Sequence, residues 1–124
     1  MQKTAKKILI VDDELDILEF LRVILEEEGY EVVTSDKGEF LEQLQDDKLP
    51  HLILVDLLLS GKDGRAIVKH LKSQPETMHI PVIMFSAHPS AYETSLQAGA
   101  EDFLAKPFTI DELLAKIAHF LKLE

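Results

Sequence analysis

Five short apolar runs recur along this sequence, and each is followed by a stretch in which apolar residues have helical spacing. The first, third and fourth runs are continuously apolar, which is typical of central strands in a parallel sheet that helices cover on both faces. The second and fifth are more mixed and are expected nearer the sheet edges. The runs span Ile8 to Val11, Glu31 to Thr34, Leu52 to Val55, Val82 to Phe85 and Asp102 to Ala105.

Five helical patterns alternate with these runs. Gly29 and Gly99 are expected to end the first and the fourth helix, because glycine readily adopts the backbone conformation found at helix C-termini. The third helix must finish before Pro75. The patterns cover residues 14–28, the segment around Phe40, Leu41 and Leu44, the segment around Ile67, Val68 and Leu71, and residues 90–99 and 109–121.

The last two helices begin with sequences typical of capping boxes, in which a hydroxyl residue is followed three positions later by glutamate. Ser90 stands before Glu93 in this way, and Thr109 before Glu112. Each pair is expected to satisfy backbone donors that would otherwise lack a partner.

Strands that alternate with helices form βαβ crossovers, which are right-handed almost without exception. A chain of 124 residues holds one domain, expected here to span residues 1–124. The predicted fold class is therefore α/β. We expect a flavodoxin-like, doubly wound sheet of five parallel strands in the order 2-1-3-4-5, with five helices.

Composition excludes several classes of function. The absence of cysteine rules out disulfides, thiolate metal sites and cysteine nucleophiles. The net charge is −10 and the basic residues are scattered, so a nucleic-acid backbone or an anionic membrane would repel the chain. No apolar stretch approaches the ~18 residues of a membrane span, and the start MQKTAKK is not expected to act as a signal peptide. We expect a soluble, cytoplasmic protein with no direct nucleic-acid binding and no membrane insertion.

Polar residues stand where four of the apolar runs end. Asp12 and Asp13 follow the first run, Asp56 the third, Ser86 the fourth and Lys106 the fifth. In open α/β sheets, ligands bind beyond the carboxyl ends of the strands, near the point where the strand order reverses. The first and third strands flank that point, so the three aspartates are expected to share one pocket, with Ser86 and Lys106 on the next two strands along.

Three carboxylates in one pocket repel one another. At ~5 Å and an effective dielectric constant of about 20, each pair is unfavourable by roughly 3 kcal/mol. Lys106 supplies one positive charge, and a divalent cation would supply the other two. Because the candidate ligands are all oxygens, a hard cation is expected, namely Mg²⁺. Mg²⁺, a lysine and a hydroxyl around one carboxylate favour phosphoryl transfer with Asp56 as the nucleophile.

Each of these residues alone has a simpler interpretation. Aspartate and serine at strand ends commonly form turns or helix caps, and a lysine before Pro107 is commonly a surface residue. Independent turn residues have no reason to fall at the same end of four neighbouring strands, so their joint placement favours a site. The histidines show no ligand arrangement; they are His51, His70, His79, His88 and His119.

Four segments carry these residues, and together they resemble the receiver (response-regulator) domains of two-component signalling over essentially the whole chain. The segments are ILIVDDE at 8–14, LILVDLLLSGKDG at 52–64, VIMFSAH at 82–88 and GAEDFLAKPF at 99–108. The resemblance implies a Mg²⁺-dependent phosphoprotein that catalyses only its own phosphorylation and dephosphorylation and is not a turnover enzyme.

The resemblance also implies a role for each matching residue. Asp56 accepts the phosphoryl group from a phosphohistidine on a sensor histidine kinase or a histidine phosphotransfer protein. Asp13, Asp56 and the backbone carbonyl of Leu58 ligate Mg²⁺ directly, and Asp12 acts through water. Lys106 contacts the phosphoryl oxygens.

Two further positions match the switch of this family. Ser86 matches the hydroxyl residue that moves to the new phosphoryl group, and Phe103 matches the aromatic that turns into the space vacated by the Ser86 loop. The added charge and acceptor oxygens are expected to bias the surface of the fourth helix, fifth strand and fifth helix, where a downstream effector protein would bind. The bond Lys106–Pro107 is expected to be cis.

The sequence departs from the family pattern in places. Ser60 stands where proline is usual, after the phosphorylation site, and Phe103 lacks the hydroxyl of the commoner tyrosine. Leu58 and His88 occupy variable positions that influence how fast water reaches the acyl phosphate. The bulk of Leu58 is expected to slow that hydrolysis.

Two other classes of function compete with the switch. A binding module that is never phosphorylated predicts a damaged pocket, whereas every charged group is present. An aspartate-nucleophile phosphatase of the haloacid dehalogenase type needs a second aspartate two positions after the first and a cap insertion, but the first strand ends in Asp12-Asp13-Glu14. Whether the domain is a free-standing shuttle in a phosphorelay or a piece of a hybrid kinase or longer regulator stays open.

Overall fold

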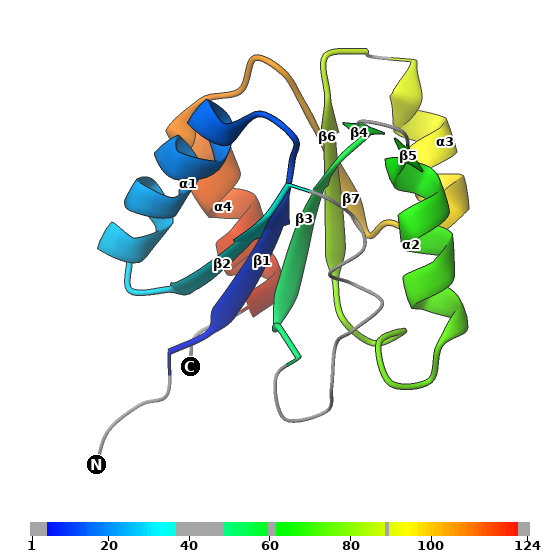
Figure 1. The fold of residues 1–124 in the computed structure, drawn as a ribbon, viewed down its shortest axis with the longest axis horizontal. Coiled ribbons are helices and arrows are strands. Elements are labelled where there is room, and N and C mark those ends of the chain that lie inside the picture. Colours follow the sequence, from blue (N-terminus) through cyan, green and yellow to red (C-terminus); the bar gives the residue numbers. More distant parts are fainter. Residues whose placement is uncertain (1–4, 37–48, 60–61, 89, 122–124) are drawn as a thin grey trace.

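The computed structural model describes residues 5–36, 49–59, 62–88 and 90–121. Within them, a parallel sheet with the strand order β2-β1-β3-β6-β7 forms the centre of the molecule (Figure 1). This is the predicted order 2-1-3-4-5, because β6 and β7 are the fourth and fifth strands of the sheet. The predicted doubly wound fold is thereby confirmed. The strands are β1 (Lys7–Val11), β2 (Glu31–Ser35), β3 (Leu52–Asp56), β6 (Val82–Ser86) and β7 (Asp102–Ala105).

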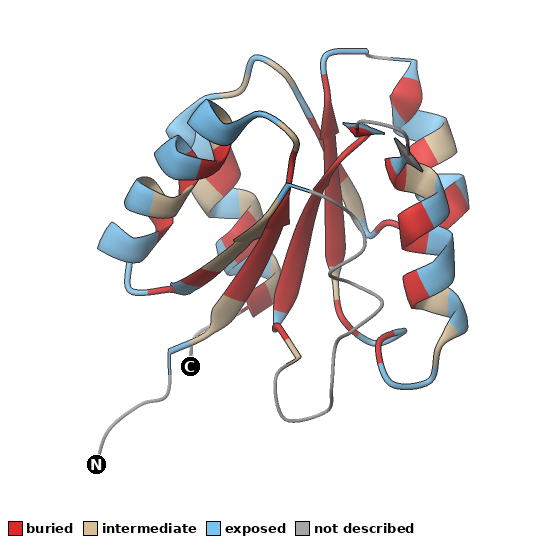
Figure 2. Ribbon diagram, in the orientation of Figure 1, coloured by how far each residue is buried: buried red, intermediate tan, exposed pale blue. Residues whose placement is uncertain are grey.

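Helices cover both faces of the sheet. On one face lie α1 (Leu15–Glu27) and α4 (Ile110–Leu121), and on the other lie α2 (Gly64–Ser73) and α3 (Ala91–Ala98) (Figure 1). The central strands are therefore buried on both sides, and they are coloured as buried along nearly their whole length in Figure 2.

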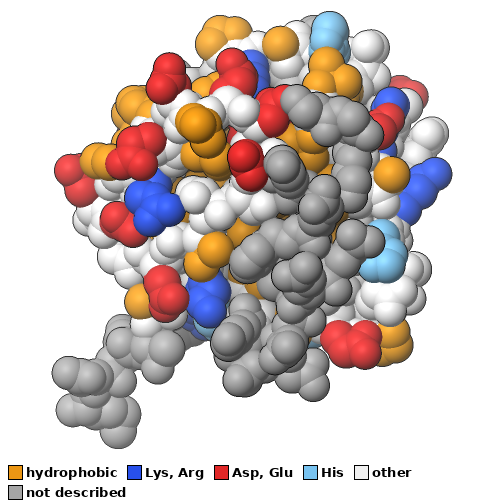
Figure 3. All heavy atoms as spheres, viewed as in Figure 1, with side chains coloured by type: hydrophobic (Ala, Val, Ile, Leu, Met, Phe, Trp, Pro, Cys, Tyr) orange, Lys and Arg blue, Asp and Glu red, His pale blue; other side chains and the backbone are white. Residues whose placement is uncertain are grey.

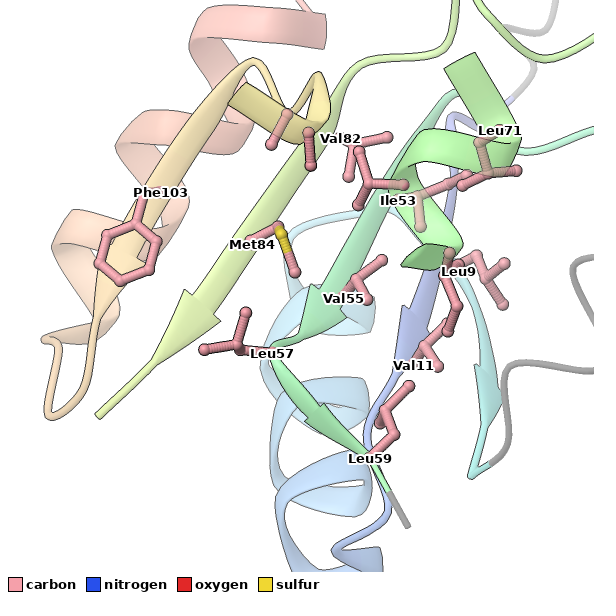
Figure 4. Packing of buried hydrophobic residues seen from close by; sticks show 14 of the residues in the cluster. Leu9, Val11, Ile53, Val55, Leu57, Leu59, Leu71, Val82, Met84 and Phe103 are labelled. Carbon is pink, nitrogen blue, oxygen red and sulfur yellow. The ribbon is translucent and has the colours of Figure 1, made fainter. Parts of the chain in front are cut away.

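Alternate residues of the central strands enter two separate apolar cores. In β1, Ile8 and Ile10 pack with residues of α1 and α4, whereas Leu9 and Val11 pack with residues of α2 and α3. Figure 4 shows the core under α2 and α3, which includes Phe103. The two-residue period of a strand thus serves both cores, and this explains why the central runs are continuously apolar.

The expected edges and helix ends are largely confirmed. The mixed runs, β2 and β7, lie at the two edges of the sheet and are partly exposed. The first helix was expected over 14–28 and is observed over Leu15–Glu27. Gly29 and Gly99 follow α1 and α3 with positive φ angles of 95° and 114°, a backbone conformation that glycine adopts without steric cost.

Some features differ from the expectation. The helix expected around Phe40 to Leu44 lies outside the described residues, and the described part of the chain contains four helices. A short antiparallel pair, β4 (Leu58–Leu59) and β5 (Lys62–Asp63), was not predicted, because two residues are too few to display a period. Strands β3 and β6 each run one residue further than expected, since the parallel ladder continues through Asp56 and Ser86.

A polar cluster ties together elements near the amino ends of the strands. In α2, Lys72 donates from Nζ to the carbonyl of Ile80 at 2.7 Å and to Oε2 of Glu101 at 2.8 Å. Oε1 of Glu101 accepts from the N–H of Val82 at 2.7 Å. A Cβ at Gly99 would lie 2.8 Å from Cγ of Lys72, so the C-terminal end of α3 contacts the lysine stem. We call Lys72, Gly99 and Glu101 the basal tie.

Only one of the two expected capping boxes is formed. The hydroxyl of Thr109 accepts from the N–H of Glu112 at 3.0 Å, and Oε1 of Glu112 accepts from the N–H of Thr109 at 2.8 Å. The expectation for Ser90 is wrong, because its side chain makes no capping hydrogen bond. Ser90 already has helical backbone angles (φ −66°, ψ −12°), whereas a capping residue usually has extended ones.

This contrast gives a matched pair of substitutions. Thr109→Ala should lower the free energy of unfolding by about 1 kcal/mol, because it leaves a helix N–H without its partner. Ser90→Ala should change it by less than about 0.5 kcal/mol, since no capping bond is lost. Urea denaturation of both variants measures the difference. Equal destabilisation by the two substitutions would contradict this assignment of the caps.

Candidate functional site

The predicted site residues meet at the carboxyl edge of the sheet. Asp12 follows β1, Asp56 ends β3, Ser86 ends β6 and Lys106 follows β7. The sheet register aligns these ends, because Asp56 pairs with Phe85 and Ser86 pairs with Ala105 in neighbouring strands. The strand order therefore gathers side chains that are distant in sequence.

The three aspartates form one cluster. Asp12, Asp13 and Asp56 each offer a carboxylate oxygen, and these oxygens all lie within 4.8 Å of one another. Asp12 and Asp56 are buried and Asp13 is half-buried. The expectation that the carboxylates share one pocket agrees with this geometry.

Asp12 is the most deeply buried of the three. Its Oδ1 accepts from the N–H of Glu14 at 2.9 Å, whereas its Oδ2 accepts no hydrogen bond from the described residues. Burial raises the pKa of Asp12 from 3.8 to about 6; the Glu14 N–H and Lys106 oppose the rise, and the Asp56 charge adds to it. A buried carboxylate oxygen that lacks a hydrogen-bond donor is suited to bind a cation, because buried charges in proteins are commonly paired or coordinate a metal ion.

Lys106 supplies the positive charge beside the cluster. Its Nζ lies 3.3 Å from Oδ1 of Asp56, 3.7 Å from Oδ2 of Asp12 and 3.9 Å from Oε1 of Glu14. Burial raises the pKa of Asp56, while Lys106 lowers it and Asp13 raises it further. One ammonium faces more carboxylates than it can neutralise. Glu14 was not predicted as part of this group, although it stands next to Asp13 in the same acidic segment.

The cluster fits a divalent cation. Its donors are all carboxylate oxygens, which suit hard cations such as Mg²⁺ and Ca²⁺. The histidines offer no competing group among the described residues, where the one cluster of candidate ligands is this acidic trio. Leu58 lies in β4 on the same loop as Asp56 and its side chain is exposed; the role of its carbonyl stays a prediction.

The serine at the end of β6 is engaged within its own loop. The hydroxyl of Ser86 accepts from the N–H of His88 at 3.0 Å, and the carbonyl of Ser86 accepts from the N–H of Lys106 at 2.8 Å. Ser86 is buried and His88 is exposed. The bond Lys106–Pro107 is cis, as the resemblance implied.

The aromatic residue of β7 points into the protein. Phe103 is buried within the core under α2 and α3 (Figure 4). Its ring meets the half-exposed ring of Tyr92 edge to face, with centroids 6.0 Å apart. Ser60, which stands where the family usually has proline, lies outside the described residues.

Gly64 allows α2 to begin close behind the site. A Cβ at this position would contact the carbonyl oxygen of Asp56 and lie 3.1 Å from that of Leu57. The N–H of Gly64 donates to the Leu57 carbonyl at 2.7 Å. Any side chain at this position would push against the backbone that carries Asp56.

A parallel α/β sheet with an acidic trio and one lysine at its carboxyl edge defines a class of protein. Comparison of this chain with known proteins identifies that class. Residues 8–118 match the response regulator receiver domain. The chain belongs to this family, which makes it a receiver domain of two-component signalling.

Similar proteins agree with this assignment. The chain is 36% identical over 118 residues to the phosphate regulon transcriptional regulatory protein PhoB of Rhizobium meliloti, a match that covers 94% of this chain and 52% of PhoB. It therefore spans about half the length of the curated relatives it matches. A putative response regulator from Chloroflexus aurantiacus has a TM-score of 0.90 at 34% identity, covering 97% of this chain and all of that one.

A second solved structure is also similar to this chain. It is the response regulator protein TrrA from Thermotoga maritima in complex with Mg²⁺ and BeF. Its TM-score is 0.82 at 29% identity, with 93% of this chain and 98% of that chain covered.

On the face drawn in Figure 3, basic side chains are interspersed among acidic ones rather than gathered in one patch. Among the helices of the described ranges, none combines the length and apolar character that crossing a bilayer requires.

Asp12 yields a prediction about stability and pH. A carboxyl whose folded-state pKa is raised stabilises the fold below its unfolded pKa, and this contribution is lost as pH rises through about 6. With divalent cations removed and near neutral pH, the free energy of unfolding of Asp12→Asn should therefore be about 2 kcal/mol higher than that of the wild type. At about pH 4 the two should differ little.

The measurement is urea denaturation in chelator at a series of pH values. Asp36→Asn is the control, because Asp36 is exposed just beyond the carboxyl end of β2 and lies outside the acidic trio. A gain in Asp12→Asn that did not depend on pH would show that the buried charge is not its cause.

Proposed function

We propose that Asp56 of this receiver domain accepts a phosphoryl group from a phosphohistidine, on a sensor histidine kinase or a histidine phosphotransfer protein. The observation that carries the proposal is the ammonium of Lys106, 3.3 Å from Asp56 within a cluster of three carboxylates. The complex of TrrA with Mg²⁺ and BeF supports it, since beryllium fluoride resembles a phosphoryl group in shape and charge.

The proposed transfer needs little covalent chemistry from the protein. A carboxylate oxygen of Asp56 forms a bond to phosphorus while the phosphorus–nitrogen bond to the donor imidazole breaks, and the electron pair stays on that nitrogen. Lys106 places its positive charge where the oxygens of the transferred group gain negative charge. Catalysis is then mainly positioning and charge compensation.

The residues that would hold Mg²⁺ are Asp13, Asp56 and the backbone carbonyl of Leu58, with Asp12 acting through water. When bound, the ion would supply positive charge that Lys106 alone cannot, because the cluster and Glu14 present more negative charge than one ammonium neutralises. Asp12 supports this arrangement, because it is fully buried and one of its oxygens accepts no hydrogen bond from the part of the chain that the structure describes.

Phosphorylation would change the balance of charge at the sheet edge. An acyl phosphate adds about one negative charge and three acceptor oxygens at Asp56. The hydroxyl of Ser86 would leave its bond from the N–H of His88 to donate to one of these oxygens. That movement would shift the loop before α3, and with it the surface formed by α3, β7 and α4.

That surface is suited to a downstream effector protein. In α3, the buried residues are the small Ala91, Ser95 and Ala98, whereas Tyr92 and Leu96 are exposed. Little apolar area holds this helix in place, so moving it costs less than moving α1 or α4. A movement of α3 would also move the ring of Phe103, because that ring packs against Tyr92 of the helix.

We expect the domain to act in the cytoplasm as a signalling element rather than a turnover enzyme, because its proposed partners are a phosphohistidine donor and an effector protein. The domain assignment to residues 1–124 stays a proposal. A binding module that is never phosphorylated is disfavoured, because the charged groups at the sheet edge lie together.

The first test concerns the acceptor. Incubation with Mg²⁺ and radiolabelled acetyl phosphate should give base-labile labelling of the wild type, and Asp56→Asn should abolish it because an amide cannot attack phosphorus at a useful rate. Asp36→Asn is the matched control and should be labelled like the wild type. Mass spectrometry maps the modified peptide. Undiminished labelling of Asp56→Asn would refute Asp56 as the acceptor.

The second test concerns the cation. Asp13→Ala should weaken Mg²⁺ binding by about tenfold or more, because a carboxylate ~4 Å from a cation contributes strongly even at a dielectric constant of about 20. Isothermal titration of the wild type and the variant with MgCl₂ measures the affinity, and Asp36→Ala controls for the loss of one surface charge. An unchanged affinity in Asp13→Ala would show that Mg²⁺ binds at another site.

A further inference from the structure

Lys106 has an aromatic neighbour in addition to its carboxylates. The Nζ of Lys106 lies over the ring of Phe85, 4.8 Å from the ring centroid. Phe85 is 2% exposed and immediately precedes Ser86 in β6. The face of an aromatic ring is negative, so a cation held over it is attracted.

The ring itself is held in place. Phe108 meets it nearly perpendicularly, with centroids 6.3 Å apart and an interplanar angle of 79°. Lys106 and Phe108 are separated by Pro107 alone, so one short segment provides both the cation above the ring and the second aromatic beside it. Phe85 is thereby fixed on β6 while the segment after β7 closes around it.

The carboxylates alone hold the ammonium loosely. Of the three that surround it, only Asp56 is close enough for a hydrogen bond, at 3.3 Å. Glu14, at 3.9 Å, has a side chain that is 62% exposed, so water competes with it for the ammonium. A lysine side chain has four flexible bonds, so its position depends on every contact that limits them.

We propose that Phe85 is a positioning residue: its ring face holds the Lys106 ammonium beside Asp56, in place for phosphoryl transfer. This inference rests on the proposed function of Asp56 and adds to it a residue that acts through Lys106. An ammonium that is already in position when the phosphoryl donor arrives needs no reorganisation during the reaction. Loss of the ring would leave Lys106 free to turn toward Glu14.

Phe85 also fills the core under α1 and α4, so a simple deletion would mix two effects. Replacing it with a trifluorinated phenylalanine nearly cancels the negative electrostatic potential over the ring face but keeps the shape of the ring. The same replacement at Phe120, which packs against the same core, is the matched control. Phe85→Leu is the second variant and removes the ring.

The first readout is the rate of Asp56 labelling by acetyl phosphate at saturating Mg²⁺. Both changes at Phe85 should lower this rate by about three- to tenfold, the range that a partly desolvated cation–π contact implies. The control at Phe120 should keep the wild-type rate. An equal rate in the fluorinated Phe85 and Phe120 proteins, with Asp56 still labelled, would overturn the inference.

The second readout does not depend on phosphorylation. In the wild type, the ring current of Phe85 should shift the NMR signals of the Lys106 ε-methylene upfield, and Phe85→Leu should return them to ordinary values while a folded spectrum is retained. Signals that do not move would also overturn the inference. If the wild type shows this shift but takes up no label at Asp56, the proposed function fails while the contact itself stands.

Discussion

Repulsion between carboxylates at one edge of the sheet is the constraint on which the rest of the site depends. The strand order places Asp12, Asp13 and Asp56 within a few ångströms of one another, and burial removes most of the water that would screen them. Lys106 offsets part of this cost through Asp56 and Asp12. Burial and, to a smaller extent, the Asp56 charge raise the pKa of Asp12 in spite of Lys106, so the compensation is incomplete. A site in this condition gains from any further positive charge, which is the property that the proposed chemistry requires.

The fold and much of the site could be predicted because both depend on short-range patterns. A two-residue period that serves two cores makes the central strands continuously apolar, and this pattern distinguishes them from the edge strands β2 and β7. Once the strand order is known, the last residue of each strand must lie at the same edge. Asp56 and Lys106 could therefore be placed together, although 50 positions separate them.

Other features depend on geometry that no local pattern contains. Ser90 has the sequence of a helix cap and does not act as one, because its backbone is already helical, whereas Thr109 with the same pattern does. Phe85 reads as one apolar residue in a buried strand; its position under Lys106 results from how the segment after β7 closes over β6. Glu14 joins the same group because its carboxylate lies 3.9 Å from the Lys106 ammonium, a contact that no local pattern displays.

The basal tie has a consequence for how α3 can move. Lys72 and Glu101 anchor the connection between α3 and β7, and the lysine stem packs against Gly99 where the helix ends. The other end of the helix is linked to the loop after β6 by the hydrogen bond from the N–H of Ala91 to the carbonyl of His88. A helix that is held at one end can rotate about that end but cannot translate along its axis. The greatest travel of α3 would then be at Ala91, so a small motion near the acids becomes a rotation of the whole outer face of the helix.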